Sequence, residues 1–156
     1  MDIQVGQKAP DFSLYDTTKK KVSLTDLKGK NVLLLFFPFA FTSTCTVELC
    51  AIRDDIARYS NANAEVLGIS VDSVYSLAKY KEEQGYNFSL LSDFNKETSA
   101  AYGSLYAEWK LNMRGVSKRS AFIIDKEGVV QYAEILEIAG DLTNFMAINQ
   151  LLKVLN

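Results

Sequence analysis

The chain has 156 residues, of which 48% are hydrophobic and 23% are charged, and its 17 basic and 19 acidic side chains give a formal charge of -2. These values are typical of a globular protein with a sizeable core, so we expect residues 1–156 to form a single domain. The balanced charge excludes an extended nucleic-acid surface. The first four residues do not fit a signal peptide, and the longest apolar run is too short to span a membrane. We therefore expect a cytoplasmic protein without membrane contact.

The first part of the chain predicts a pair of short strands. Residues 11–16 alternate apolar and polar side chains, and Val22 and Leu24 follow after a polar turn. This pattern indicates an N-terminal β-hairpin. The next residues, 24–29, form a short turn or helix that ends at Gly29.

The following stretch predicts a buried strand and a helix. Residues 32–37 are apolar without alternation, which is typical of a strand covered on both faces, and Pro38 ends it. A helical stripe with spacings of three and four residues follows, made up of Leu49, Ile52, Ile56 and Tyr59. Ser43 or Thr44 can cap this helix, which places Cys45 in its first turn.

Two interpretations of Cys45 follow from this position. The unpaired N–H groups and the partial positive charge of a helix N-terminus favour a thiolate over a thiol. However, Cys45 precedes Leu49 by four residues and therefore continues the apolar stripe, where a small buried cysteine would also fit. The position in the helix leaves both interpretations open.

The rest of the chain continues to alternate strands and helices. Residues 65–71 predict a second buried strand, which would complete a βαβ unit. We expect helices over 73–84 and 96–102, separated by a short strand over 88–91. Residues 104–118 are the least regular part of the chain.

The last segment predicts a second hairpin and a final helix. Strands are expected over 120–125 and 129–136, which flank a short turn. The final helix is expected over 142–155, with a buried stripe made up of Leu142, Phe145, Met146, Leu152 and Leu155. The order of elements predicts an α/β fold with a mixed central sheet, helices on both faces and an N-terminal hairpin.

The cysteine and histidine content limits the chemistry. The chain has two cysteines, Cys45 and Cys50, and no histidine. The lack of histidine excludes Ser-His-Asp triads, Cys-His pairs and histidine metal sites, and two thiols are too few for a structural zinc site. We therefore expect neither a metal ion nor a cofactor.

Pro38, Thr42 and Cys45 form a P-x3-T-x2-C motif, which resembles the active-site loop of peroxiredoxins, the thiol peroxidases of the thioredoxin fold. The resemblance extends along most of the chain, through the blocks 9–12, 66–72, 90–93 and 119–125. The chain resembles both the AhpE-like and the Q-type (bacterioferritin comigratory protein-like) groups of this family. The resemblance implies a thioredoxin-like fold for the whole chain.

The resemblance also implies roles for five residues. Cys45 would be the thiolate that attacks the peroxide and becomes a sulfenic acid, and Thr42 would place its hydroxyl near the sulfur and the peroxide. Pro38 would limit the access of water, and Arg119 would supply a permanent positive charge with several donors in a fixed fork. Glu48 would either orient Arg119 through a bidentate pair or be a solvated glutamate that the helix dipole favours.

Cys50 is the internal candidate for a resolving thiol, which would convert the sulfenic acid to an intramolecular disulfide. Its spacing from Cys45 is that of the Q-type group, whereas other blocks are closer to the AhpE group, which does not generally use this partner. Either Cys50 or an external thiol therefore resolves Cys45. The resemblance further implies hydrogen peroxide or organic hydroperoxides as substrates, thioredoxin or a similar thiol as reductant, and a homodimer.

A disulfide between the two cysteines would require the helix to unwind. Five residues along a helix separate Cα atoms by about 8–9 Å and place the side chains on different faces. A disulfide needs Cα atoms within about 7 Å of each other. We therefore expect both cysteines to be helical and unbonded in the reduced protein.

Other functions remain open. The thiol could belong to a redox sensor whose disulfide state a partner protein reads, or the chain could be a holdase-like scaffold without chemistry. The residues around Cys45 favour turnover, because a sensor needs a reactive thiol but not rapid chemistry. Two aromatic residues of the irregular part, Tyr106 and Trp109, fit either a cover over the active-site mouth, a dimer contact or ordinary packing.

Overall fold

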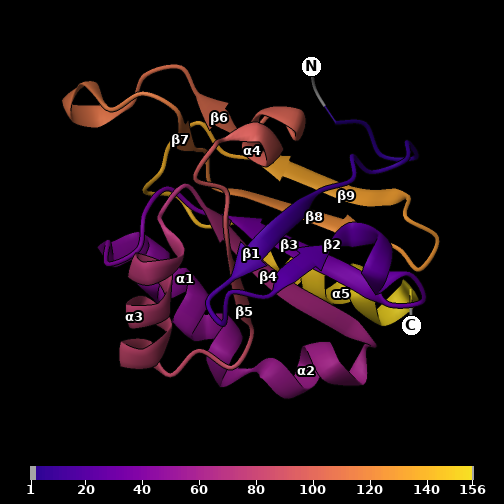
Figure 1. Cartoon of the computed structure of the whole chain (residues 1–156). Coiled ribbons are helices and arrows are strands. Elements are labelled where there is room, and N and C mark those ends of the chain that lie inside the picture. The colour runs from indigo at the N-terminus through magenta and orange to yellow at the C-terminus, as the bar shows by residue number, and fades with distance from the viewer. Residues whose placement is uncertain (1–2, 156) are drawn as a thin grey trace.

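A seven-stranded sheet in the order β2-β1-β5-β4-β3-β8-β9 organises the computed structural model, which describes residues 3–155 (Figure 1). Its strands are β1 (Ser13–Asp16), β2 (Lys21–Ser23), β3 (Asn31–Phe36), β4 (Ala64–Ser70), β5 (Ser89–Ser92), β8 (Ser120–Ile124) and β9 (Val130–Ile135). The neighbours β3, β4 and β5 are parallel, whereas β1, β2, β8 and β9 join the sheet through antiparallel pairs. The mixed sheet and the N-terminal hairpin predicted from the sequence are therefore confirmed.

Five α-helices connect or cover these strands: α1 (Ser43–Asp54), α2 (Ile56–Asn61), α3 (Val74–Gln84), α4 (Glu97–Ala101) and α5 (Phe145–Leu155). Short 3-10 helices occur at η1 (Leu24–Leu27) and η2 (Lys110–Asn112), and β6 (Leu105–Tyr106) pairs with β7 (Val116–Ser117) in a second, two-stranded sheet. The sequence pattern missed this small sheet because strands of two residues carry no detectable period. Within residues 3–155, none of the helices is long and apolar enough to cross a bilayer.

The central strand β3 is buried along its whole length, between parallel β4 and antiparallel β8. Successive side chains of a strand point to opposite faces, so β3 contributes to two separate clusters of core residues. Leu33 and Leu35 belong to the first cluster, whereas Leu34 and Phe36 belong to the second. The unbroken apolar run in the sequence is explained by these two covered faces.

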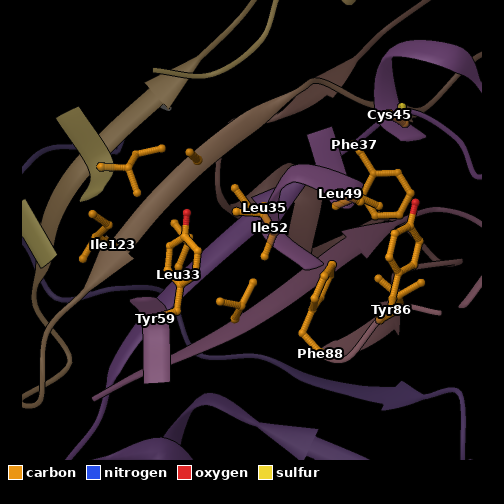
Figure 2. Close-up of a cluster of buried hydrophobic side chains, with 14 of the residues drawn as sticks. Leu33, Leu35, Phe37, Cys45, Leu49, Ile52, Tyr59, Tyr86, Phe88 and Ile123 are labelled. Atoms are coloured by element: carbon orange, nitrogen blue, oxygen red, sulfur yellow. The ribbon is translucent and has the colours of Figure 1, made fainter. Parts of the chain in front are cut away.

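The four longer helices contribute to the first cluster on the first face of the sheet. Figure 2 shows Leu49 and Ile52 of α1 and Tyr59 of α2 in this cluster. Leu77 of α3 and Ile148 of α5 belong to it as well. The second face is covered by the N-terminal segment with Phe12, by η1 with Leu24, and by Tyr102 directly after α4. Helices therefore cover both faces, as the sequence predicts, but most of the helical residues lie on one of them.

The expected single helix from Cys45 to Tyr59 is divided in the structure. Asp55 leaves the helical conformation (φ -125°, ψ 28°), so that α1 ends at Asp54 and α2 begins at Ile56. The Asp55 N–H binds the Ile52 carbonyl at 3.1 Å, which tightens the last turn of α1 and ends it. The apolar stripe continues across this break because Ile52 and Tyr59 both remain buried.

The final helix begins later than expected, and the prediction that Leu142 and Met146 belong to its buried stripe is wrong. Leu142 precedes the helix and is 45% exposed, and Met146 is 81% exposed. The buried stripe of α5 runs instead through Ile148 and Leu152, with Phe145 and Leu155 partly buried beside it. Met146 lies two residues before Ile148 and therefore points to another side of the helix.

Candidate active site

The carboxyl end of β3 leads directly into the site. Phe37 continues the pairing with β4, since its N–H binds the Ile69 carbonyl at 3.0 Å, and buried Pro38 then ends the strand. After a short loop the chain enters α1, in which Cys45 is the third residue. The cysteine thus lies beyond the carboxyl end of a central strand, where ligand sites of open α/β sheets are usually found.

Thr42 begins α1, in place of the predicted caps Ser43 and Thr44, which are the first two helical residues. Its backbone is extended and its carbonyl accepts the Thr46 N–H at 3.0 Å. Its hydroxyl does not cap the helix but donates to the Phe39 carbonyl at 2.8 Å. The Thr42 side chain therefore fixes the loop that precedes the helix, and leaves its oxygen available as an acceptor.

The loop between β3 and α1 is held by two further contacts. The Ala40 N–H donates to a carboxylate oxygen of Asp72 at 2.8 Å, and the Ser70 hydroxyl donates to the same oxygen at 2.6 Å. Burial raises the pKa of the Asp72 carboxyl, and these two donors partly offset the rise. Phe41 has a left-handed backbone (φ 67°), which is uncommon for a bulky residue, and its ring packs against Tyr80 with 5.0 Å between centroids.

Arg119 lies directly before β8 and is only 1% exposed. Its Nη2 donates to the Cys45 sulfur at 3.2 Å, and its Nη1 donates to Glu48 Oε1 at 3.0 Å. Nε and Nη2 also donate to the Ala139 carbonyl, at 3.1 and 3.0 Å. The planar guanidinium is therefore directed at three acceptors at once, and one of them is the cysteine sulfur.

Glu48 is 0% exposed, so the predicted alternative of a solvated glutamate is wrong. The expected pair with Arg119 is present, but through one oxygen only: Oε1 accepts from Arg119, whereas Oε2 accepts from the Thr143 hydroxyl at 2.9 Å. Burial raises the pKa of the Glu48 carboxyl, and the charge of Arg119 and the Thr143 hydroxyl oppose this rise. Burial would lower the pKa of the Arg119 guanidinium, but Glu48 and Cys45 raise it, so the arginine stays charged.

Cys45 is buried within the first core cluster, and its side chain also borders a pocket of about 150 Å³. The pocket is lined by Pro38, Thr42, Ser43, Thr44, Cys45, Trp109, Lys110, Arg119, Ala139 and Gly140. Four of the residues singled out in the sequence therefore meet here: Pro38, Thr42, Cys45 and Arg119. A small molecule in this pocket would lie against the sulfur and the groups around it.

Trp109 brings an aromatic ring to the lining of the pocket. The Trp109 ring lies 5.9 Å from that of Phe39 and stacks on Tyr106 at 6.1 Å between centroids. The Tyr106 hydroxyl donates to the Glu137 carbonyl at 2.7 Å, and Lys110 lies 5.4 Å above the Trp109 ring. The place of Trp109 in the pocket lining agrees with a cover over the pocket, while a dimer contact remains a prediction.

Cys50 lies further along α1, half-buried and outside the pocket lining. Its sulfur is 3.6 Å from Gln84 Oε1 and 3.9 Å from the Tyr86 hydroxyl, so it faces the end of α3 and the residues after it. Both cysteines are free thiols within one helix, as expected for the reduced protein.

Ala139 and Thr143 were not singled out in the sequence. Ala139 acts through its backbone carbonyl, which no residue type reveals, and Thr143 is 95 residues from Glu48 in the chain. Across residues 3–155, no group of three His, Cys, Asp or Glu side chains gathers in a way that could hold a metal ion.

Comparisons with known proteins agree with this geometry. The sequence model of the AhpC/TSA family matches residues 5–133. Alkyl hydroperoxide reductase E of Mycobacterium bovis is 37% identical over 136 residues, which cover 85% of this chain and 86% of the relative. Among solved structures, peroxidoxin BcpB from Mycobacterium tuberculosis superposes with a TM-score of 0.87 at 29% identity over 99% of both chains. Peroxiredoxin Q of Xanthomonas campestris superposes with a TM-score of 0.81 at 26% identity, covering 92% of this chain and 90% of that one.

Proposed function

Because the chain belongs to the AhpC/TSA family of peroxiredoxins and is therefore a thiol peroxidase, we propose that Cys45 is its peroxide-reacting thiolate. The family, the thioredoxin-like fold and the enzyme class predicted from the sequence are confirmed. A sensor or a scaffold without chemistry does not account for the membership of this enzyme family. The roles of individual residues are our proposal.

The observation that carries the proposal is the 3.2 Å hydrogen bond from Arg119 to the Cys45 sulfur beside the pocket. The thiolate attacks one oxygen of a hydroperoxide, the O–O bond breaks, and Cys45 becomes a sulfenic acid. The second oxygen leaves as alkoxide or hydroxide and takes up a proton. Donors that already face the sulfur can stabilise the negative charge as it moves to the leaving oxygen.

Thr42 and Pro38 suit the binding of the hydroperoxide. Because the Thr42 hydroxyl gives its hydrogen to the Phe39 carbonyl, its oxygen can accept the O–H of a hydroperoxide. This contact would aim the terminal oxygen at the sulfur. Pro38 offers no N–H, so it does not hold water through a backbone donor at this point of the pocket.

Glu48 has a positioning role in this proposal. Its carboxylate holds Nη1 of Arg119, while the Ala139 carbonyl holds Nε and Nη2. These partners fix the plane of the guanidinium, so that Nη2 points at the sulfur. The buried pair is thus better understood as a positioning device than as a source of stability.

We further propose that Cys50 resolves the sulfenic acid. The Cys50 thiolate attacks the Cys45 sulfur, the S–O bond breaks, and the oxygen leaves as water with the proton of the Cys50 thiol. A dithiol such as thioredoxin would then return two electrons and become the disulfide itself. Such a cycle suits a reducing compartment, so the cytoplasm remains the expected location. A single domain over residues 1–156 and a homodimer also remain predictions.

The experiment that tests the site follows hydrogen peroxide and cumene hydroperoxide during single turnover and with excess dithiol. Cys45→Ser should abolish consumption of both. Cys50→Ser should retain the first turnover but lose the internal disulfide, which mass spectrometry detects after one equivalent of peroxide. Wild-type consumption by Cys45→Ser would overturn the assignment of the thiolate, and the lack of a disulfide in the wild type would overturn the role of Cys50 alone.

A further inference from the structure

A row of hydroxyl side chains, made up of Thr46, Tyr80 and Tyr86, lies between the N-terminal turn of α1 and Cys50. The Thr46 hydroxyl donates to the Thr42 carbonyl at 2.8 Å and lies 2.8 Å from the Tyr80 hydroxyl. The Tyr80 ring packs edge to face on the ring of Tyr86, with 5.1 Å between centroids. The Tyr86 hydroxyl in turn lies 3.9 Å from the Cys50 sulfur. The two ends of the row are therefore the first residue of the active-site turn and the second cysteine.

The direction of the hydrogen bonds through Thr46 follows from counting donors, because a hydroxyl carries one hydrogen. Thr46 gives its hydrogen to the Thr42 carbonyl, so Tyr80 must donate to Thr46. The one hydrogen of the Cys50 thiol has two acceptors within reach, Gln84 Oε1 at 3.6 Å and the Tyr86 hydroxyl at 3.9 Å. Burial raises the pKa of both phenols, so each keeps its proton at neutral pH. The two hydrogen bonds through Thr46, from Tyr80 to Thr46 and from Thr46 to Thr42, point the same way and strengthen one another.

Tyr80 contacts the active-site loop as well as Thr46. It is fully buried on α3, and its ring supports Phe41, whose left-handed backbone directly precedes Thr42. A bulky residue in this conformation is strained, and it persists only where surrounding contacts hold it. In Figure 2 the Tyr86 hydroxyl points toward the end of the core cluster where Cys45 lies. Tyr80 therefore contacts both the loop, through its ring, and the first turn of α1, through its hydroxyl.

We propose that Tyr80 is a positioning residue whose hydroxyl holds the first turn of α1 in its peroxide-reactive form and limits how fast Cys50 reaches Cys45. The inference rests on the proposed function of Cys50. The two Cα atoms of a helix at this spacing are about 8–9 Å apart, so the turn must unwind before the disulfide can form. While the turn stays folded, a second hydroperoxide can oxidise the sulfenic acid to sulfinic acid, and it is itself reduced to an alcohol or water.

Tyr80→Phe tests this role because it keeps the supporting ring and removes only the hydroxyl. We expect disulfide formation to become roughly fivefold to tenfold faster, the effect of losing one buried hydrogen bond that the unwound form does not make. The sulfinic fraction at high peroxide should fall accordingly. Trp109, the one tryptophan of the chain, lines the pocket, so its fluorescence can follow both steps in a rapid-mixing experiment. Mass spectrometry of quenched samples assigns the products.

Tyr102→Phe is the matched control. Tyr102 is also buried, and its hydroxyl donates to the Pro10 carbonyl at 2.6 Å, but its ring belongs to the second core cluster. Both variants should lose comparable stability in thermal denaturation, whereas only Tyr80→Phe should accelerate disulfide formation. If Tyr80→Phe does not fold, Thr46→Val removes the other side of the same hydrogen bond with a side chain of similar shape, and we expect the same acceleration.

Each remaining outcome decides against the inference. Disulfide formation at the wild-type rate or slower in Tyr80→Phe, or equal acceleration in Tyr102→Phe, would overturn it while leaving the proposed function intact. A wild-type protein that forms no internal disulfide would instead remove the proposed role of Cys50, on which the inference depends. Mass spectrometry of the oxidised wild type distinguishes the two cases: an internal disulfide confirms the role of Cys50, and its lack removes that role.

Discussion

Arg119→Lys tests whether the shape of the guanidinium, and not only its charge, accelerates the reaction with peroxide. Arg119 uses three nitrogens to reach Cys45, Glu48 and the Ala139 carbonyl. A lysine ammonium presents its donors from a single point on a flexible stem, so it can face Glu48 but cannot also span the other two acceptors. We expect the rate constant for peroxide to fall between tenfold and a thousandfold, about 1.4–4 kcal/mol, as for the loss of a transition-state donor.

The assay is single-turnover oxidation by hydrogen peroxide, followed through Trp109 fluorescence, together with thermal denaturation. Arg119→Lys should fold nearly as well as the wild type because Glu48 keeps a cationic partner. Arg119→Met alone would leave the Glu48 carboxylate buried and unpaired, at about 3–5 kcal/mol, so the matched neutral pair is Arg119→Met with Glu48→Gln. A wild-type rate in Arg119→Lys would refute the argument from shape, and a wild-type rate in the neutral pair would make the arginine structural.

Three other predictions concern the surroundings of Arg119 and the pocket. Because burial raises the pKa of Glu48, its carboxylate should take up a proton at higher pH than an ordinary glutamate. The rate of reaction with peroxide should therefore decline as the pH falls through this pKa, and Glu48→Gln should lose this decline from the pH-rate profile. Thr143→Val leaves Oε2 of Glu48 without its donor and should lower the free energy of unfolding by about 1–3 kcal/mol in urea titration, with a smaller loss of rate than Arg119→Lys. Trp109→Ala removes apolar contact area and should slow the reaction with cumene hydroperoxide roughly tenfold more than that with hydrogen peroxide, and equal effects on both substrates would contradict a role in binding.

Local patterns allowed the central part of the fold to be predicted. Residues 32–37, most of which form β3, indicate a strand covered on both faces, because no polar side chain interrupts them. The place of Cys45 in the first turn of α1 followed from the helical spacing after Pro38. The position of Arg119 opposite Cys45 could not be derived in this way, since 74 residues separate the two, and it was expected only from the resemblance to a family.

Predictions that depended on tertiary contacts were less reliable. The sequence leaves open whether Glu48 pairs with Arg119 or faces solvent, and it is buried because Arg119 and Thr143 reach it from distant parts of the chain. Thr42 caps α1 through its backbone position, while its hydroxyl turns to the Phe39 carbonyl, an arrangement that helix-capping preferences do not predict. Met146 was assigned to the core by period alone, but the sheet lies on another side of α5.

The arrangement around Arg119 also limits what its charge can do. A guanidinium that is paired with the buried Glu48 carboxylate adds little net positive charge to the site, since the two charges lie 3.0 Å apart. What remains is direction: Nη2 points at the sulfur from 3.2 Å, while Glu48 and the Ala139 carbonyl keep the other nitrogens in place. The N-terminus of α1 adds its partial positive charge on the same cysteine. Acceleration in this site should therefore depend on oriented donors at short range, which is why the shape of Arg119 matters more than its charge.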